Sequence, residues 1–155
     1  MHPNEKLIRE FYEAFQRRDA EGMTRCYAPD VTFGDPVFPE LKGDDAGAMW
    51  TMLCEQGKDL RLEFRDVAAD DREGRAHWEA WYSFGPGKRP VHNVIEARFE
   101  LRDGRIVRHQ DTFDFYRWSR QALGFMGLLF GWTGFLRRAV QKQAAAGLRK
   151  FRARG

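Results

Sequence analysis

The stretch GRIVRHQDTFDFY, residues 104–116, decides how this sequence is interpreted. It begins with a glycine turn and continues with the alternation of a half-buried β-strand, which places His109, Asp111 and Phe113 on one face. A histidine and a carboxylate are unusual on a plain core strand, because buried polar groups need partners. This face therefore either lines a cavity where chemistry takes place or points to water. Phe113, and Phe115 beyond it, favour burial.

The rest of the chain indicates an α+β protein. Helical spacing predicts a first helix capped by Asn4, a short helix around Met23 and a third helix from Asp44 to Gln56. Strand-like alternation, interrupted by turns, follows in the middle of the chain. Sequential antiparallel strands after a helical N-terminal third are typical of helices packed on one face of a curved sheet. The ranges expected as strands are 31–33, 60–64, 75–84, 91–101 and 104–116.

Composition and charge exclude several classes of protein. The net charge of +3 conceals seven basic residues and no acid between 137 and 155, so the rest of the chain carries −4. Because the basic character belongs to this tail, we expect no nucleic-acid partner. The N-terminus has no apolar signal segment, and Cys26 and Cys54 are far apart in helical patterns. We therefore expect a soluble, cytoplasmic protein with free thiols.

The C-terminal part, from about Trp118, is helical and differs from the rest. Residues 122–136, ALGFMGLLFGWTGFL, are fifteen uncharged residues with four glycines, which is shorter than the roughly 20 residues of a membrane-spanning helix. With the basic segment 137–155, this run could lie on an anionic membrane surface. We favour packing over the sheet or a partner subunit, because core helices with solvated charges are the commoner use of such patterns.

Two sets of side chains could carry chemistry. Asp35 stands in the loop FGDPVFP, at a strand end and directly before a proline. If it faces a hydrophobic cavity, desolvation raises its pKa towards that of a useful base; the alternative is an Asx-type turn cap. His109 and Asp111 lie about 7 Å apart on one strand face, where a carboxylate can orient an imidazole or share acid and base roles with it. The alternative is a solvated surface pair.

The strand over 75–84 leaves its inward face undecided. Trp81 shares one face with His77, while Trp78 is on the other, and a register shift of one residue reverses the answer. Glu96 has the same ambiguity. No spacing typical of a metal site is present, nor a glycine-rich phosphate loop, a GxSxG turn or a CxxC pair. We therefore expect no metal and no cofactor.

Two stretches, YAPDVTFGDPVFPELKG (27–43) and DGRIVRHQDTFDFY (103–116), resemble the nuclear-transport-factor-2-like (NTF2-like) superfamily. This group includes ketosteroid isomerases, SnoaL-like polyketide cyclases and limonene-1,2-epoxide hydrolase. The resemblance covers about 4–118 and implies a cone-shaped, curved antiparallel sheet wrapped round N-terminal helices, with an apolar pocket at one end. It also implies a homodimer. We divide the chain into an NTF2-like (SnoaL-like) domain, 1–118, and an apolar, then basic, helical extension, 119–155.

The resemblance also implies roles for individual residues. Similarity to ketosteroid isomerases places Asp35 at the position of the general base. It places Phe11 where those enzymes have an oxyanion-binding tyrosine, with Tyr12 pointing elsewhere, and it places the acid position near Glu96. In polyketide cyclases, an aspartate on the last strand acts with a nearby histidine, which resembles Asp111 here. Epoxide hydrolases use a matching aspartate together with an Arg-x-Asp pair that residues 75–84 lack.

We therefore expect a cofactor-independent acid–base enzyme that acts on a small hydrophobic carbonyl compound in an apolar cone pocket. Its catalytic residues would be Asp35, Asp111 and His109, with Asp111 at the base of the cone and His109 nearer the rim. A non-catalytic small-molecule-binding module and an epoxide hydrolase-like activity remain alternatives. The residues expected to contact the substrate are Phe11, Trp50, Trp78, Trp81, Glu96 and Phe113.

Overall fold

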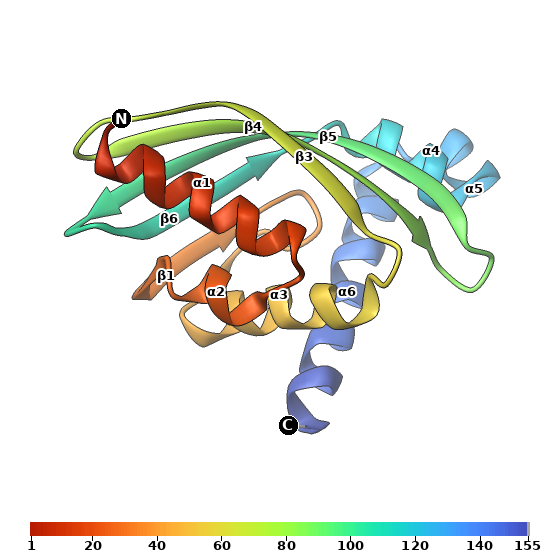
Figure 1. Ribbon diagram of the computed structural model, residues 1–155. Helices are drawn as coiled ribbons and strands as arrows, with labels where there is room; N and C mark the ends of the chain where they lie inside the picture. Colours follow the sequence, from red (N-terminus) through yellow and green to blue (C-terminus); the bar gives the residue numbers. More distant parts are fainter. Residues whose placement is uncertain (155) are drawn as a thin grey trace.

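A curved six-stranded sheet wraps round three N-terminal helices in the computed structural model, which describes residues 1–154 (Figure 1). This is the expected α+β architecture. The elements are α1 (Pro3–Gln16), α2 (Ala20–Thr24), β1 (Tyr27–Gly34), β2 (Leu41–Lys42), α3 (Asp44–Gln56), β3 (Arg61–Ala69), β4 (Glu73–Phe84), β5 (Arg89–Arg102), β6 (Arg105–Thr112), α4 (Phe115–Leu123), α5 (Phe125–Phe130) and α6 (Gly134–Arg154).

The strands lie in the order β2-β1-β6-β5-β4-β3. Strands β3 to β6 form an antiparallel meander, as expected, and Asp103 and Gly104 form the two-residue turn into β6 with φ of 52° and 74°. Two successive residues with positive φ are typical of a type I′ hairpin turn. Strand β1 runs parallel to β6, which the sequence did not indicate, and Phe33 pairs with His109. Strand β6 is therefore flanked by strands on both sides.

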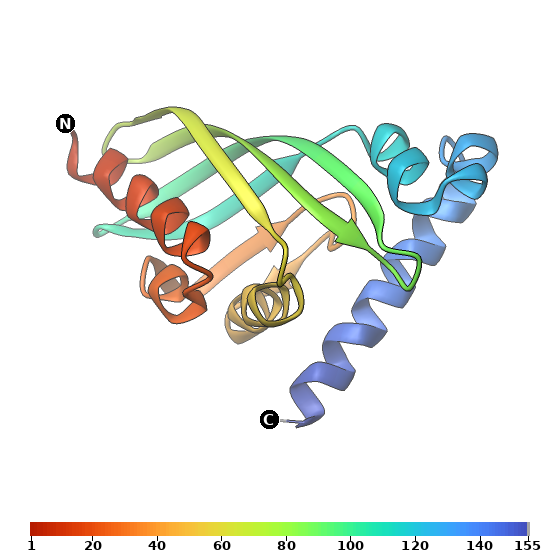
Figure 2. The ribbon, with the colours of Figure 1, turned by 45° about the vertical axis from the view of Figure 1, so that its right-hand side comes forward.

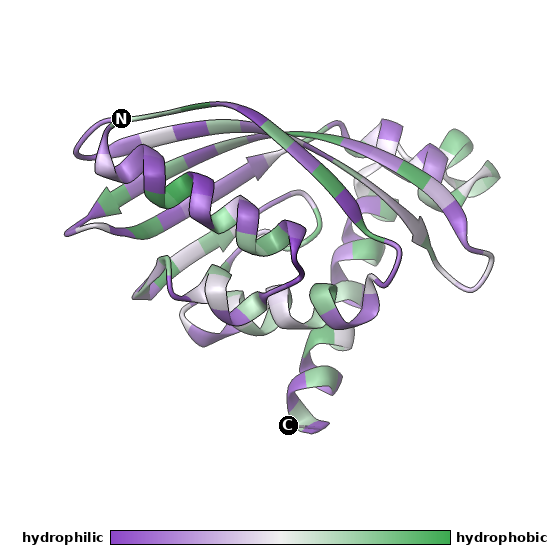
Figure 3. Ribbon diagram, in the orientation of Figure 1, coloured by the Kyte–Doolittle hydropathy of each residue, from purple (hydrophilic) through white to green (hydrophobic). Residues whose placement is uncertain are grey.

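The inner face of the sheet packs against α1, α2 and α3, and Figure 2 shows these helices inside the curve of the strands. The strands alternate between hydrophobic and hydrophilic residues (Figure 3) because one face is buried and the other is exposed. Irregularities in pairing occur between Arg65 and Ala68 of β3 and at Glu100 of β5. Such bulges bend a strand and increase its twist, which helps to close the sheet round the helices.

The start of α1 differs from the expectation. His2, not Asn4, is the N-cap, and its Nδ1 accepts a hydrogen bond from the Asn4 backbone N–H at 3.0 Å. The Asn4 side chain is buried and donates to the carbonyl oxygens of Asp70 and Asp71 at 2.9 and 3.3 Å. Asn4 therefore ties α1 to the β3–β4 turn, a long-range contact that helical spacing does not contain.

The end of β6 also differs from the expectation. The strand ends at Thr112 rather than continuing to Tyr116. Asp114 caps α4 instead, because its Oδ1 accepts the backbone N–H of Arg117 at 3.0 Å. Phe113 is therefore a half-buried residue between a strand and a helix.

The C-terminal helices pack on the sheet and on α3. One face of α4 is buried in a small cluster beyond the main core, formed by Val91, Phe115, Trp118 and Ala122. Helix α6 lies against α3, where Leu148 is buried and Arg152 pairs with Asp45. The expected division between 118 and 119 falls within α4 and stays a prediction. None of the helices described in residues 1–154 is long and apolar enough to cross a membrane.

Candidate acid–base site

His109 and Asp111 of β6 point into the cone, as the position of Phe113 on the same strand face indicated. Their residues are 0% and 2% exposed, and His109 Nε2 lies 2.9 Å from Asp111 Oδ1. Phe113, two residues further on, is half-buried. Both side chains are buried, and which of the two lies nearer the rim of the cone stays a prediction.

A chain of hydrogen bonds holds the His109 ring. The indole Nε1 of Trp50 donates to Tyr27 Oη at 2.8 Å, and Tyr27 Oη lies 2.8 Å from His109 Nδ1. Since an indole is only a donor, the Tyr27 hydroxyl accepts from Trp50 and its own proton is left for Nδ1. His109 Nε2–H then donates to Asp111. In this arrangement each donor from Trp50 to His109 has an acceptor, with a neutral imidazole between the Tyr27 hydroxyl and the Asp111 carboxylate.

Aromatic rings exclude water from His109 on several sides. Its ring centroid lies 4.4 Å from that of Phe99, 5.0 Å from Phe33 and 5.5 Å from Phe11. Trp50 stacks on it at 6.1 Å. The imidazole is thus enclosed, and the group that it can orient is the carboxylate of Asp111.

Tyr12 was missed by the sequence analysis, which expected it to point elsewhere. It is fully buried and stacks on Phe64, and among the residues described its Oη is the one fully buried side-chain polar atom without a hydrogen-bond partner. Burial, and then the charge of Asp111, raise the pKa of Tyr12 well above its usual value. The sequence does contain a pattern that predicts burial of Tyr12, because Ile8, Tyr12 and Phe15 have the spacing of a single helix face.

Asp35 directly follows β1. Both interpretations made from the sequence apply to it: it caps an Asx-type turn, and its carboxyl group is desolvated. Its Oδ1 accepts the backbone N–H groups of Val37 at 2.7 Å and Phe38 at 2.6 Å, which is an Asx-type turn. Burial raises the pKa of Asp35 to about 7; the Phe38 N–H opposes this rise and the charge of Asp111 adds to it. Its Oδ2 receives no hydrogen bond from residues 1–154. This oxygen is free to carry or accept a proton.

Tyr82 lies near Asp35, and its neighbour Trp118 belongs to helix α4. Trp118 Nε1 donates to Tyr82 Oη at 2.8 Å. Burial raises the pKa of Tyr82 to about 12; the Trp118 hydrogen bond opposes this and the charge of Asp35 contributes. Val37, Tyr82 and Phe113 are half-buried and touch both the main core and the cluster on α4. We call this junction around Asp35 the mouth. No local sequence pattern joins Tyr82 to Trp118.

Two residues that were expected to contact the substrate, Trp81 and Glu96, lie on the outer face of the sheet and point away from the cone. Trp78 is buried on the inner face, and Trp81 is therefore on the outer face, where it stacks on His92 at 4.6 Å. Glu96 is exposed on the same outer face and is hydrogen-bonded to His77. The register of β4 against β5 decides this, and the sequence left it open.

The remaining expected contacts are on the inner side. Phe11, Trp50 and Trp78 are buried in the core, and Trp78 Nε1 lies 3.4 Å from Asp111 Oδ1. Phe113 is at the mouth.

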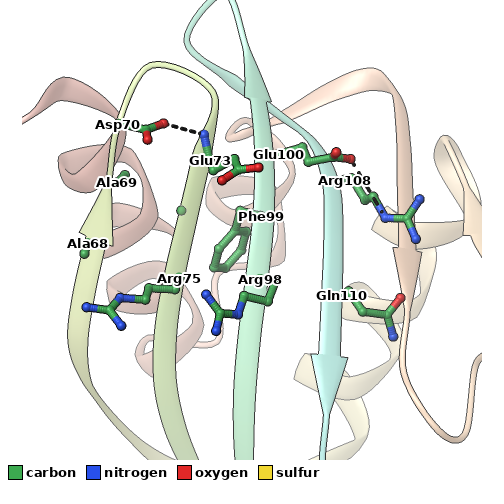
Figure 4. A pocket seen from close by; sticks show the side chains of 11 residues that line it. Ala68, Ala69, Asp70, Glu73, Arg75, Arg98, Phe99, Glu100, Arg108 and Gln110 are labelled. Carbon is green, nitrogen blue, oxygen red and sulfur yellow. Dashed lines mark hydrogen bonds and ion pairs between the residues drawn. The ribbon is translucent and has the colours of Figure 1, made fainter.

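Two hollows of the protein surface lie on the outer face of the sheet. One of about 660 Å³ is lined by residues that include Arg75, Arg98 and Gln110 (Figure 4), and a second of about 330 Å³ adjoins it. Neither contains His109 or Asp111. The apolar pocket inside the cone therefore stays a prediction. Within residues 1–154, no group of three or more His, Cys, Asp or Glu side chains could hold a metal ion.

The cone-shaped sheet, its helices and the polar groups inside it define an NTF2-like fold. The sequence model of the SnoaL-like domain matches residues 8–109. Because this match covers more than half of the chain, the protein belongs to the SnoaL-like domain family. No curated protein matches the chain.

Solved structures agree with this assignment. An NTF2-like protein of unknown function from Burkholderia pseudomallei is 22% identical, with a TM-score of 0.68, and the alignment covers 79% of this chain and 98% of that one. A proposed polyketide cyclase from Xanthomonas campestris pv. campestris is 24% identical (TM-score 0.64; 77% and 96% covered). An LEH-like epoxide hydrolase from M. tuberculosis is 21% identical (TM-score 0.64; 82% and 95% covered). At these identities, the likeness concerns the fold.

Proposed function

We propose that this protein is an acid–base enzyme that moves a proton on a small hydrophobic carbonyl compound, with Asp35 as the group that carries the proton. One observation supports this most: Asp35 has one oxygen held by two backbone N–H groups, a second oxygen without a hydrogen-bond partner among residues 1–154, and a pKa raised by burial to about 7. A base with a pKa near the working pH is both available and strong enough. A structural turn cap needs neither the free oxygen nor the raised pKa.

The reaction would begin at a carbon next to the carbonyl group. Asp35 Oδ2 takes the proton, the C–H electron pair forms the carbon–carbon double bond of an enolate, and the carbonyl oxygen becomes negative. Tyr82 Oη accepts from Trp118, so its own proton is free to be donated to that oxygen. Asp35 then returns the proton to a carbon conjugated with the enolate, or the enolate attacks a second carbonyl group of the same molecule and Asp35 gives its proton to the alkoxide that forms.

His109 and Asp111 would act through Asp35 rather than on the substrate. The charge of Asp111 contributes to the raised pKa of Asp35. His109, held by Tyr27, keeps the Asp111 carboxylate in place. We therefore assign His109 and Asp111 as positioning residues.

An epoxide hydrolase-like reaction has less support. The resemblance to those enzymes requires an arginine and an aspartate on the strand that is β4 here. The inner face of β4 instead carries Ala76, Trp78 and Ala80. Two members of that acid–base set are therefore absent.

Proton exchange tests the proposal without knowledge of the natural substrate. The protein is incubated in D₂O with hydrophobic ketones of increasing size, such as a cyclohexanone, a tetralone and a 3-ketosteroid, and loss of the α-proton signal is followed by NMR. Wild type is compared with Asp35→Asn, and Asp30→Asn serves as control, since Asp30 is an exposed carboxylate of β1, the strand that directly precedes Asp35.

We expect exchange with at least one ketone, and a loss of about 10²- to 10⁴-fold in Asp35→Asn only. Equal exchange in wild type and Asp35→Asn would show that Asp35 is not the base. If a ketone binds by saturation-transfer NMR but no protein exchanges its protons, the protein is a binding module instead.

A further inference from the structure

The C-terminal extension carries the largest exposed apolar side chains of the protein. They belong to α5, the turn after it and the first turn of α6, and we call them the α5 surface. Figure 3 shows the hydrophobic character of α5. Trp132 and Phe135 are the most exposed of the set, at 76% and 77%. The α5 surface consists of Phe125, Met126, Leu128, Leu129, Phe130, Trp132 and Phe135.

These side chains are turned outward by the packing of α5 on α4. A Cβ atom at Gly127 would collide with the carbonyl oxygen of Ser119, and one at Gly131 would collide with the Ser119 hydroxyl. The glycine side of α5 therefore faces α4, and the bulky side chains lie on the opposite side. Tyr116 Oη fixes the arrangement by donating to the carbonyl oxygen of Leu128 at 3.1 Å. The exposure is thus a consequence of close packing.

The surroundings of the α5 surface are positively charged. From Phe115 to the end of the chain there are nine arginines and lysines and no acid, so the preceding residues carry −6. Arg138, Lys142 and Arg149 follow Phe135 at spacings of three, four and seven residues, which places all four on one side of α6. The three cations are exposed and form no ion pair within residues 1–154. The other side of α6 packs on the protein.

Exposed aromatic and aliphatic side chains beside unpaired cations match the chemistry of an anionic lipid surface. The apolar groups enter the boundary between headgroups and acyl chains, and the cations contact lipid phosphates. A second copy of this chain is a poorer partner, because a symmetric contact through the α5 surface would bring two strongly cationic extensions together. Like charges at an interface oppose association.

We propose that the α5 surface inserts into the interfacial layer of an anionic bilayer, with Arg138, Lys142 and Arg149 against the headgroups. Helix α4 connects this surface to the mouth, because Trp118 on its inner side holds Tyr82. Docking would therefore bring the mouth close to lipid-dissolved hydrophobic compounds. The proposal does not depend on the acid–base function, since it rests on a different surface.

Co-sedimentation with vesicles tests the proposal. The full chain is mixed with phosphatidylcholine vesicles and with vesicles that also contain phosphatidylglycerol. Wild type is compared with Trp132→Ser/Phe135→Ser and with Arg138→Glu/Lys142→Glu. The matched control is Lys6→Glu/Lys58→Glu, which makes the same change in charge at exposed positions in the N-terminal half. Thermal unfolding checks that each variant is folded, and light scattering gives its oligomeric state.

We expect wild type to bind the anionic vesicles and to be released by high salt. The Trp132/Phe135 variant should bind at least about tenfold more weakly, and the Arg138/Lys142 variant at least about 20-fold more weakly. The control should change by less than about twofold. Absence of vesicle binding would overturn the proposal, as would equal binding to neutral vesicles. A change of oligomeric state in the Trp132/Phe135 variant, without vesicle binding by wild type, would assign the α5 surface to a second copy instead.

Discussion

Replacing Asp35 by asparagine should change how the stability of the protein depends on pH. Asparagine keeps an oxygen that can accept the backbone N–H groups of Val37 and Phe38, but it cannot ionise. The pKa of Asp35 rises from an ordinary value of 3.8 to about 7 in the folded protein. One pH unit corresponds to about 1.4 kcal/mol, so ionising Asp35 costs the folded state about 4 kcal/mol.

The sign follows from the proton balance. Between pH 4 and pH 7 the folded protein holds a proton on Asp35 that the unfolded chain has lost, so Asp35 makes the free energy of unfolding fall as the pH rises. Its contribution is fully present below about pH 4 and is lost above about pH 7. The Asp35→Asn variant lacks this loss. The free energy of unfolding of the variant, relative to that of wild type, should therefore rise by up to about 4 kcal/mol between pH 4 and pH 8.

Urea unfolding of both proteins across this pH range measures the difference. Asp30→Asn is the control with the opposite sign. The hydrogen bond from Arg102 holds the pKa of Asp30 below its usual value, so any contribution from this pair is lost as the pH falls. Parallel stability curves for wild type and Asp35→Asn would mean that Asp35 titrates normally, and would refute both its desolvation and its assignment as the base.

Three further substitutions test other parts of the structure. Tyr27→Phe removes the hydroxyl bonded to His109 and should lower the free energy of unfolding by about 1–3 kcal/mol, since it leaves buried groups unpaired; urea unfolding that matches wild type would contradict the hydrogen-bond chain. Glu96→Gln should leave ketone proton exchange within about twofold of wild type, because Glu96 is on the outer face; a large loss would place it in the site. Gly127→Ala should cost about 1–3 kcal/mol by collision with Ser119, and an unchanged thermal midpoint would argue against that close packing.

Local periodicity accounts for the parts that the sequence predicted well. The alternation of β6 placed His109 and Asp111 on one face, and Phe113 indicated that this face is buried. Helix α3 has the expected bounds, Asp44–Gln56. These features depend on residues that are close together in the sequence, within one or two helical turns or a few strand residues, and their spacing is visible in the sequence.

Errors arose where partners distant in the sequence decide the structure. The side of the sheet on which Trp81 and Glu96 lie depends on the register of two long strands and on which face meets the helices. The hydroxyl of Tyr82 is hydrogen-bonded to Trp118, which is 36 positions away in the sequence, and that hydrogen bond holds α4 at the mouth.

The sequence by itself determined the α+β class, the buried polar face of β6 and the unusual character of the extension. Only the tertiary structure decided that β1 runs parallel to β6. It also decided that Asp35 lies where burial, and to a lesser extent the charge of Asp111, raise its pKa, and that α5 presents its apolar side outward. The physical reason is one of range. Periodicity and capping are set by neighbouring residues, whereas strand pairing, desolvation and exposure depend on contacts between segments that come together only when the chain folds.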